Sequence, residues 1–411
     1  MLSPLPRRSA PYAIRRIGAI VFALAALAGC DLLFPPEEPP AAPPEIVFHT
    51  LGPSFSAKIF VADGAAVRWT FADGSTSADL SPVKDYGMYR PRSASLLVTP
   101  WSALIGIDVG YDAGDGGQLP LYDQEDENAV VVQRGYALPG QDIWAIENLD
   151  LVRDSLEVFC ASNNQQLISL DFSGFSRLHT IECYLCSGLF SVSLDDLPAL
   201  RRACFEDCDL YELDLSGCPA LADLRGAVNG YPTIVFGDFP YPDVWHICVR
   251  DNGATLQSDP DLFADTTRFP NLTELFIWND GQTGTLRIPH TGPGNVSILV
   301  AGNAYSTLDL QGALLDTGYS GNIDVSYNRL TAINLAGCVQ VTNFTARSCQ
   351  LSAGQMADLL TTLYGLGREN SSGNHDYGTW TVDLSGNSAP DAAVMAAAEL
   401  LRARGWAIIL P

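Results

Sequence analysis

Histidines and cysteines are the side chains of this chain that could most readily perform acid–base, nucleophilic or metal chemistry. The five histidines lie far apart in the sequence, at His49, His179, His246, His290 and His375. No GxSxG elbow, HExxH helix, phosphate-binding glycine loop or dinucleotide fingerprint accompanies them. Each histidine is therefore interpreted as an exposed or packing residue, and the sequence predicts neither an enzyme nor a bound cofactor.

The chain also has ten cysteines, which could bind metal or form disulfides. Cys183 and Cys186 form a CxxC pair, but no second pair stands at zinc-finger spacing and no histidine pair complements it. The sequence therefore predicts no metal site.

Residues 1–29 have the pattern of a targeting leader. Arginines precede an apolar stretch of about 12 residues, which is too short to span a bilayer. The stretch ends in LAGC, which is similar to the lipobox of bacterial lipoproteins. That resemblance implies cleavage before Cys30 and attachment of lipid to it, with the Pro-rich residues 30–45 as a tether to a membrane. An ordinary secretory signal with an incidental cysteine is the alternative.

The elements that would position any site follow from a repeat. A pattern of about 22 residues, LxxLxL followed three positions later by Asn, Cys or Asp, recurs along the chain. Its copies begin at Leu156, Leu178, Leu200, Leu221, Val244, Leu272, Val296, Ser320 and Val341. A unit this short cannot enclose a core, so its inward fourth and sixth residues must pack on those of the next coil. The repeat therefore predicts a solenoid over residues 156–351.

The ninth position of each copy lies where the strand turns away and the buried backbone needs polar partners. Most copies have asparagine or cysteine there, at Asn164, Cys186, Cys208, Asn229, Asn252, Asn328 and Cys349. Asp280 and Ala304 depart from this rule. The copies LRRACFEDCDL and YELDLSGCPAL resemble the leucine-rich repeats of bacterial surface proteins, internalin-like in the broad sense. The resemblance implies a parallel concave sheet.

Apart from Cys30, the cysteines recur in phase with the repeat, which favours structural packing over a disulfide framework. Cys160 and Cys204 share a phase but lie two coils apart, roughly 10 Å, which is beyond the reach of a disulfide. Cys186 and Cys208 are equivalent in adjacent coils, so one disulfide between them stays open.

Residues 46–110 alternate short apolar runs with turn signals, which predicts a β-sandwich ahead of the repeats. The stretch VRWTFADGST resembles the signature of PKD domains, in which Trp69, Asp73 and Gly74 match and Ala72 replaces the usual glycine. We expect a PKD-like or immunoglobulin-like unit there.

Two further segments flank the repeats. Residues 111–155 are expected to be an acidic linker and a cap for the first coil. Calcium binding at residues 112–128 stays an alternative to an exposed acidic loop, although the spacing fits no EF-hand. Residues 352–411 predict an α/β C-terminal cap, in which a second helix opens near Asp391 and ends at Gly405 before a final strand.

The leucine-rich resemblance implies a recognition face, because the third, fifth and seventh residues of each coil point outward from the concave sheet. The face comprises Glu182, Tyr184, Arg202, Glu206, Asp223, Arg225, His246, Arg250, Glu274, Phe276 and Trp278. Exposed aromatic and arginine side chains most often supply binding energy at interfaces. Phe276, Trp278 and Arg250 are expected to form an aromatic and cationic cluster outside the core.

The formal net charge of −24 disfavours nucleic acid as a partner, because an acidic surface repels phosphate backbones. The expected fold is mixed and β-rich, with an N-terminal β-sandwich, a leucine-rich solenoid and an α/β cap. The expected function is that of a monomeric, lipid-anchored, extracytoplasmic protein of the bacterial cell envelope that binds a protein or glycan on its concave face. A structural surface component without a dedicated ligand is the main alternative, and an unrecognised envelope hydrolase is a third.

Overall fold

The computed structural model describes residues 42–110, 142–230, 233–253, 262–316, 318–367 and 380–411, together with the backbone of residues 255 and 256. The leader, Cys30 and the acidic residues 112–128 lie outside these ranges, so the structure does not bear on lipidation or on calcium binding there. The chain divides into two units, Met1–Pro43 and Pro44–Pro411, and the helices and strands of the described residues belong to the second. No helix among the described residues is long and apolar enough to cross a membrane.

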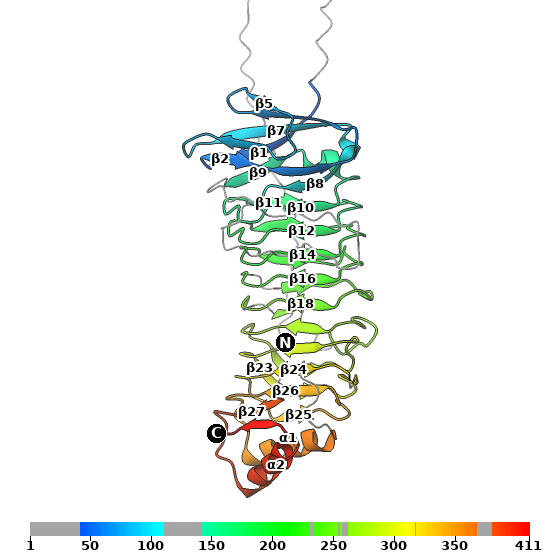
Figure 1. Cartoon of the computed structure of the whole chain (residues 1–411), viewed down its shortest axis with the longest axis vertical. Coiled ribbons are helices and arrows are strands. Elements are labelled where there is room, and N and C mark those ends of the chain that lie inside the picture. Colours follow the sequence, from blue (N-terminus) through cyan, green and yellow to red (C-terminus); the bar gives the residue numbers. More distant parts are fainter. Residues whose placement is uncertain are drawn as a thin grey trace, which may run out of the picture. The chain divides into compact units, whose positions relative to one another are not determined.

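A sheet of thirteen strands, here called the main sheet, dominates this unit (Figure 1). From β8 to β28 neighbouring strands pair in parallel, and β3 adds an antiparallel edge. In spatial order the strands are β3 (Lys58–Val61), β8 (Leu104–Asp108), β10 (Val158–Cys160), β12 (Thr180–Glu182), β14 (Arg202–Cys204), β16 (Asp223–Arg225), β18 (His246–Cys248), β20 (Glu274–Phe276), β22 (Val296–Leu299), β24 (Gly321–Asp324), β26 (Val341–Thr345), β27 (Thr381–Asp383) and β28 (Ala407–Ile409).

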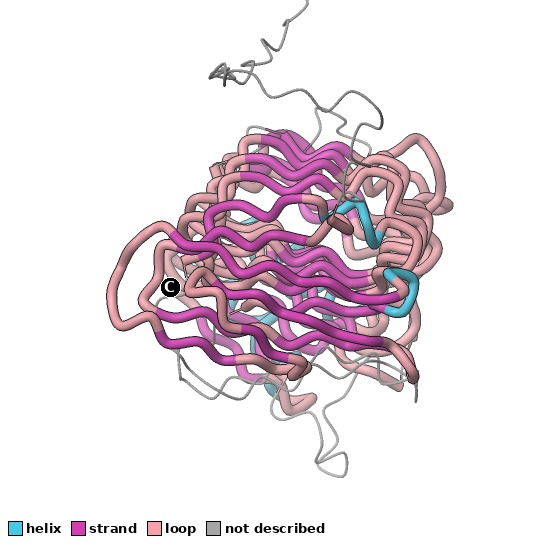
Figure 2. The backbone as a smooth tube through the Cα atoms, turned by 90° about the horizontal axis from the view of Figure 1, so that it is seen from above, coloured by secondary structure: helices cyan, strands magenta, loops and turns pink. Residues whose placement is uncertain are grey.

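A second series of parallel strands accompanies the main sheet, and the coils lie as stacked layers (Figure 2). These strands are β11 (Ser169–Asp171), β13 (Ser191–Ser193), β15 (Glu212–Asp214), β17 (Thr233–Val235), β19 (Thr255–Leu256), β21 (Thr283–Arg287), β23 (Ala304–Asp309) and β25 (Ala332–Asn334). The predicted solenoid is confirmed as a β-solenoid of about 10 turns. Inward residues such as Ile181, Leu224 and Phe344 are fully buried, because each packs on its counterpart in the next coil.

The ninth-position side chains join the coils as a ladder. The Asn164 amide donates to the carbonyls of Val109 and Ala161, at 2.9 and 2.8 Å. Cys208 occupies the equivalent place and directs its thiol to the Cys183 carbonyl at 2.8 Å. Asparagine and cysteine side chains of the ladder thus satisfy buried carbonyls, as the sequence pattern predicts.

The predicted register is wrong by one residue in one coil. Ile298, rather than Leu299, pairs with Leu275, so this copy begins one residue before Val296. The ladder position therefore falls on Asn303, which donates to the Ile277 carbonyl at 2.6 Å, and not on Ala304. The error arose because Val296 is itself apolar and imitates the first residue of the pattern.

The segment before the repeats forms an antiparallel sheet in the order β5-β4-β7-β1-β9 and a small sheet of β2 and β6. Its strands are β1 (Ile46–Thr50), β2 (Ser54–Ser56), β4 (Ala66–Phe71), β5 (Thr76–Ser77), β6 (Val83–Asp85), β7 (Arg92–Thr99) and β9 (Ile143–Glu147). Trp69 is fully buried against Phe48 and Phe55. Since β3 and β8 from the same segment belong to the main sheet, this unit continues directly into the first coil.

The C-terminal segment contributes the two helices, α1 (Ala353–Gly365) and α2 (Ala392–Arg402), which pack against each other. Asp391 caps α2 by accepting from the backbone N–H groups of Ala393 and Val394, and Gly405 follows its end with a φ of +84°. The strands β27 and β28 alternate with the helices and extend the main sheet. This is the order that the sequence predicts for the cap.

Candidate ligand-binding face

The residues predicted as a recognition face come from the third, fifth and seventh positions of successive coils. Strand register places the third-position residues Arg202, Asp223 and His246 side by side on β14, β16 and β18. The fifth positions form a neighbouring column and the seventh positions a third one. We call these three columns the sheet face.

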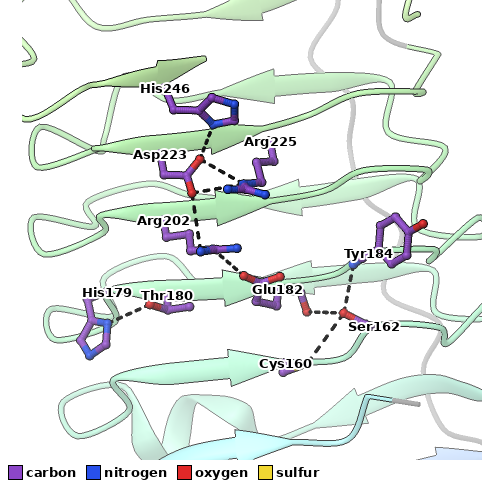
Figure 3. Close-up of polar contacts among 10 residues, drawn as sticks. All are labelled: Cys160, Ser162, His179, Thr180, Glu182, Tyr184, Arg202, Asp223, Arg225 and His246. Carbon is purple, nitrogen blue, oxygen red and sulfur yellow. Dashed lines mark hydrogen bonds and ion pairs between the residues drawn. The ribbon is translucent and has the colours of Figure 1, made fainter. Parts of the chain in front are cut away.

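Charged side chains of the first two columns form a continuous chain of ion pairs (Figure 3). Arg202 lies 2.6 Å from a Glu182 carboxylate oxygen and 3.6 Å from one of Asp223. His246 Nδ1 lies 2.6 Å from Asp223 Oδ1, and its Nε2 is 3.8 Å from Glu274 Oε2. Arg225 bonds both oxygens of Asp223 at 3.2 Å.

This chain of ion pairs is buried, which the sequence did not predict. Glu182 is fully buried, and Asp223 and His246 are only 5% and 4% exposed. The expectation of an open surface is wrong at these residues. Charges removed from water need partners, and here the carboxylates of Glu182 and Asp223 each have an arginine beside them. Although burial opposes ionisation, the hydrogen bond to His246 and the nearby Arg225 and Arg202 hold the pKa of Asp223 below its ordinary value.

Buried thiols alternate with these charges along the fifth-position column. In this column Cys160 precedes Glu182, Cys204 lies between Glu182 and Arg225, and Cys248 follows Arg225. None of these three cysteines forms a disulfide. Burial raises the pKa of Cys204 well above its ordinary value and that of Cys248 to about 11. The thiols of Cys204 and Cys248 are therefore protonated at neutral pH, and neither supplies a nucleophilic thiolate beside the His246 imidazole.

The structure brings together the side chains of the expected aromatic and cationic cluster. The Arg250 guanidinium lies over the Trp278 ring, 5.2 Å from its centre, and the rings of Phe276 and Trp278 are 5.9 Å apart. His246 extends the cluster, since its ring centre is 5.4 Å from that of Phe276. Phe276 and Trp278 are half-buried and lie outside the core. Arg250 also forms an ion pair with Asp251 at 2.9 Å.

The remaining predicted residues lie at the edge of this cluster or away from it. Glu206 is half-exposed on the coil before Arg225, and its carboxylate is 3.9 Å from the Cys248 thiol. Tyr184 lies further toward the first coil, where its backbone N–H donates to Ser162 Oγ at 3.2 Å. Tyr184 is therefore not brought together with Trp278.

Sequence reasoning missed residues on the C-terminal side of Trp278. Asp324 belongs to the same face, and Tyr327 lies just beyond it with 61% of its surface exposed. Their coil was recognised, but the predicted face ended at Trp278. In the corrected register, counting onward through Ser297 and Asn322 would have found Asp324, whereas Tyr327 stands at the eighth position and is not found by this rule.

A further group of thiols lies within the stack. Cys183, Cys186 and Cys208 are buried and free, so the disulfide left open between Cys186 and Cys208 is not formed in this structure. The Cys186 thiol instead directs its hydrogen to the Ala161 carbonyl at 3.1 Å. In the part of the chain that the structure describes, no group of three or more His, Cys, Asp or Glu side chains is arranged to hold a metal ion.

Comparison of the chain with models of known protein families, with curated proteins and with solved structures found no match.

Proposed function

We propose that this protein is a leucine-rich repeat lipoprotein of a bacterial cell envelope, which binds a protein or glycan through the sheet face of its solenoid. Lipid on Cys30 would anchor it and residues 30–45 would tether it, while the segment before the repeats would act as a PKD-like spacer. The observation that carries the proposal is the cluster of Arg250, Phe276 and Trp278. Such a group is half-exposed on a rigid scaffold, where aromatic and arginine side chains act as binding hot spots.

The buried ion pairs support the cluster rather than compete with it. The His246 ring contacts Phe276 on one side and is held by Asp223 on the other. The Phe276 ring therefore packs against a side chain that is itself fixed in position. A side chain that is already held loses little conformational entropy when a ligand binds. The sheet face is therefore suited to binding, while its buried charges and protonated thiols offer no activated nucleophile.

The test compares full-length protein in detergent with two alanine variants. Trp278→Ala should weaken retention of a solubilised cell-envelope fraction by about 30-fold, or about 2 kcal/mol, as removal of a hot spot does. Tyr211→Ala is the matched control, because Tyr211 is an exposed aromatic residue next to β15 on the second series of strands. Surface plasmon resonance measures retention, and thermal melts verify that both variants remain folded.

Two results would contradict the proposal. Equal retention by wild type and Trp278→Ala would favour the alternative of a structural surface component without a dedicated ligand. A large fall in melting temperature of Trp278→Ala would place this side chain among the stabilising contacts instead of the binding surface.

A further inference from the structure

Trp278 has very different neighbours on its two sides. On the side of the preceding coil, the Arg250 guanidinium covers the ring. On the side of the following coil, the residue in register is Ala301, because the Asn279 backbone N–H donates to the Ala301 carbonyl at 3.1 Å. The indole ring therefore has a cation on one side, whereas the residue in register with Trp278 on the other side contributes only a methyl group.

The coil beside Trp278 is also flat at the next position. Gly302 has a φ of +69°, and a Cβ atom there would collide with Oδ1 of Asn279. Position 302 therefore has no room for a side chain. One coil further on, Tyr327 projects with 61% of its surface exposed, in register with Gly302 through the hydrogen bond from Gly302 N–H to the Ser326 carbonyl. By register, Trp278 precedes Ala301 by one coil and Tyr327 follows Gly302 by one coil, in the adjacent column. The two aromatic residues thus bracket a floor of Ala301 and Gly302 and are two coils apart, or roughly 10 Å.

Polar groups border this floor. The half-exposed Asp324 carboxylate accepts from the Ser326 backbone N–H at 2.9 Å and stands in the middle column of the sheet face. On the next coil, Arg347 has a side chain that is 52% exposed and is held by Asp383 at 2.7 Å. On the other side, the exposed Asn279 amide donates to Asp251 at 2.8 Å. Acceptors and donors therefore surround an apolar floor between two aromatic side chains.

This combination fits a sugar ring. A pyranose has apolar C–H faces, which pack on aromatic rings, and a rim of hydroxyls, which both donate and accept hydrogen bonds. The chain's net charge of −24 disfavours a polyanionic glycan. We infer that the floor between Trp278 and Tyr327 is a carbohydrate subsite for a neutral or N-acetylated pyranose. The inference rests on the proposed function and narrows its ligand from protein or glycan to glycan.

The experiment fills the floor without removing the aromatic residues. Full-length wild type and Ala301→Leu are titrated with chitohexaose and with cellohexaose by isothermal calorimetry, and with heparin as the polyanionic comparison. Ala332→Leu is the matched control, since Ala332 is an exposed residue at the start of β25 in the second series of strands, outside the sheet face. At least one of the two neutral oligosaccharides should bind wild type and Ala332→Leu equally, and should bind Ala301→Leu at least tenfold more weakly.

Tyr327→Ala and Trp278→Ala serve as second variants, and decide the question if Ala301→Leu melts at a lower temperature than wild type. Each should also lose at least tenfold in oligosaccharide affinity. Binding of neither neutral oligosaccharide, binding of heparin alone, or undiminished binding by these variants would overturn the subsite.

The envelope fraction separates this outcome from failure of the proposed function. If Trp278-dependent retention persists but is abolished by protease treatment of the fraction, the ligand is a protein; the face then binds and the carbohydrate subsite is wrong. If neither the fraction nor the oligosaccharides bind, the proposed function and the carbohydrate subsite are both wrong.

Discussion

Asp280 occupies a ladder position at which most other coils have an asparagine or cysteine that donates a hydrogen bond. Its equivalents donate a hydrogen bond to a carbonyl, whereas an ionised carboxylate only accepts. Asp280 Oδ1 accepts from the Asn252 backbone N–H at 2.8 Å, and no hydrogen-bond partner for Oδ2 is found among the described residues. With the side chain 2% exposed, burial raises its pKa to about 7. A neutral Asp280 keeps the donor that the ladder position requires.

The stability of the solenoid should therefore depend on pH through Asp280. Its pKa is about 7 in the folded chain, against an ordinary value of 3.8, so the folded state retains a proton that the unfolded state releases. The contribution of protonated Asp280 to the free energy of unfolding is fully present below about pH 4 and is lost as the pH rises toward about 7. Asp280→Asn should remove this dependence and stabilise the protein at pH 8 by on the order of 3 kcal/mol.

Chemical denaturation at pH 4.5 and at pH 8 measures this effect. Asp63→Asn is the control for a lost negative charge, because Asp63 is exposed in a turn of the N-terminal segment. A gain in stability from Asp280→Asn that was the same at both pH values would show that Asp280 does not titrate in this range.

At the scale of the element, the sequence period predicted the features that all coils share, and it missed those that depend on single side chains of one coil. The inward positions and the phase of the cysteines follow from packing rules that act on every coil, whereas the C-terminal cap follows from the local helix signals at Asp391 and Gly405. The copy at Val296 failed because two adjacent registers place apolar residues inward, and only the Asn303 amide decides between them. Burial of Glu182 and His246 was not predictable either, since it depends on charges contributed by neighbouring coils.

The corrected register makes a prediction about that coil. Asn303→Ala should destabilise the protein by about 1–3 kcal/mol, because it leaves the carbonyls of Ile277 and Val300 without their donor. Ala304→Ser, one residue away at the half-exposed start of β23, should change stability by less than about 0.5 kcal/mol. Urea denaturation of both variants measures the difference. The reverse order of effects would restore the register that begins at Val296.

At the scale of the whole molecule, the proposed binding surface arises from the stacking of coils rather than from any one coil. Arg250, Trp278, Ala301 and Tyr327 come from four successive coils, and only the strand register brings them together. A short motif search cannot find such a site, because its residues are about 80 positions apart at the extremes and share no local pattern. Counting along the corrected repeat finds Arg250, Trp278 and Ala301 at seventh positions, but Tyr327 stands at the eighth position and is added by the structure.

The proposed anchor can be tested on the whole protein in cells. Cys30→Ala should abolish membrane association, since the leader's apolar stretch is too short to hold the chain in a bilayer and the lipid would supply the attachment. Carbonate washing followed by fractionation measures the bound share, with Cys160→Ala as the control because that thiol is buried in the solenoid. We expect Cys160→Ala to stay with the membrane and Cys30→Ala to move entirely to the soluble fraction. If Cys30→Ala remained membrane-bound after the wash, the chain would be attached by something other than lipid on Cys30, and residues 30–45 would lose their proposed role as a tether.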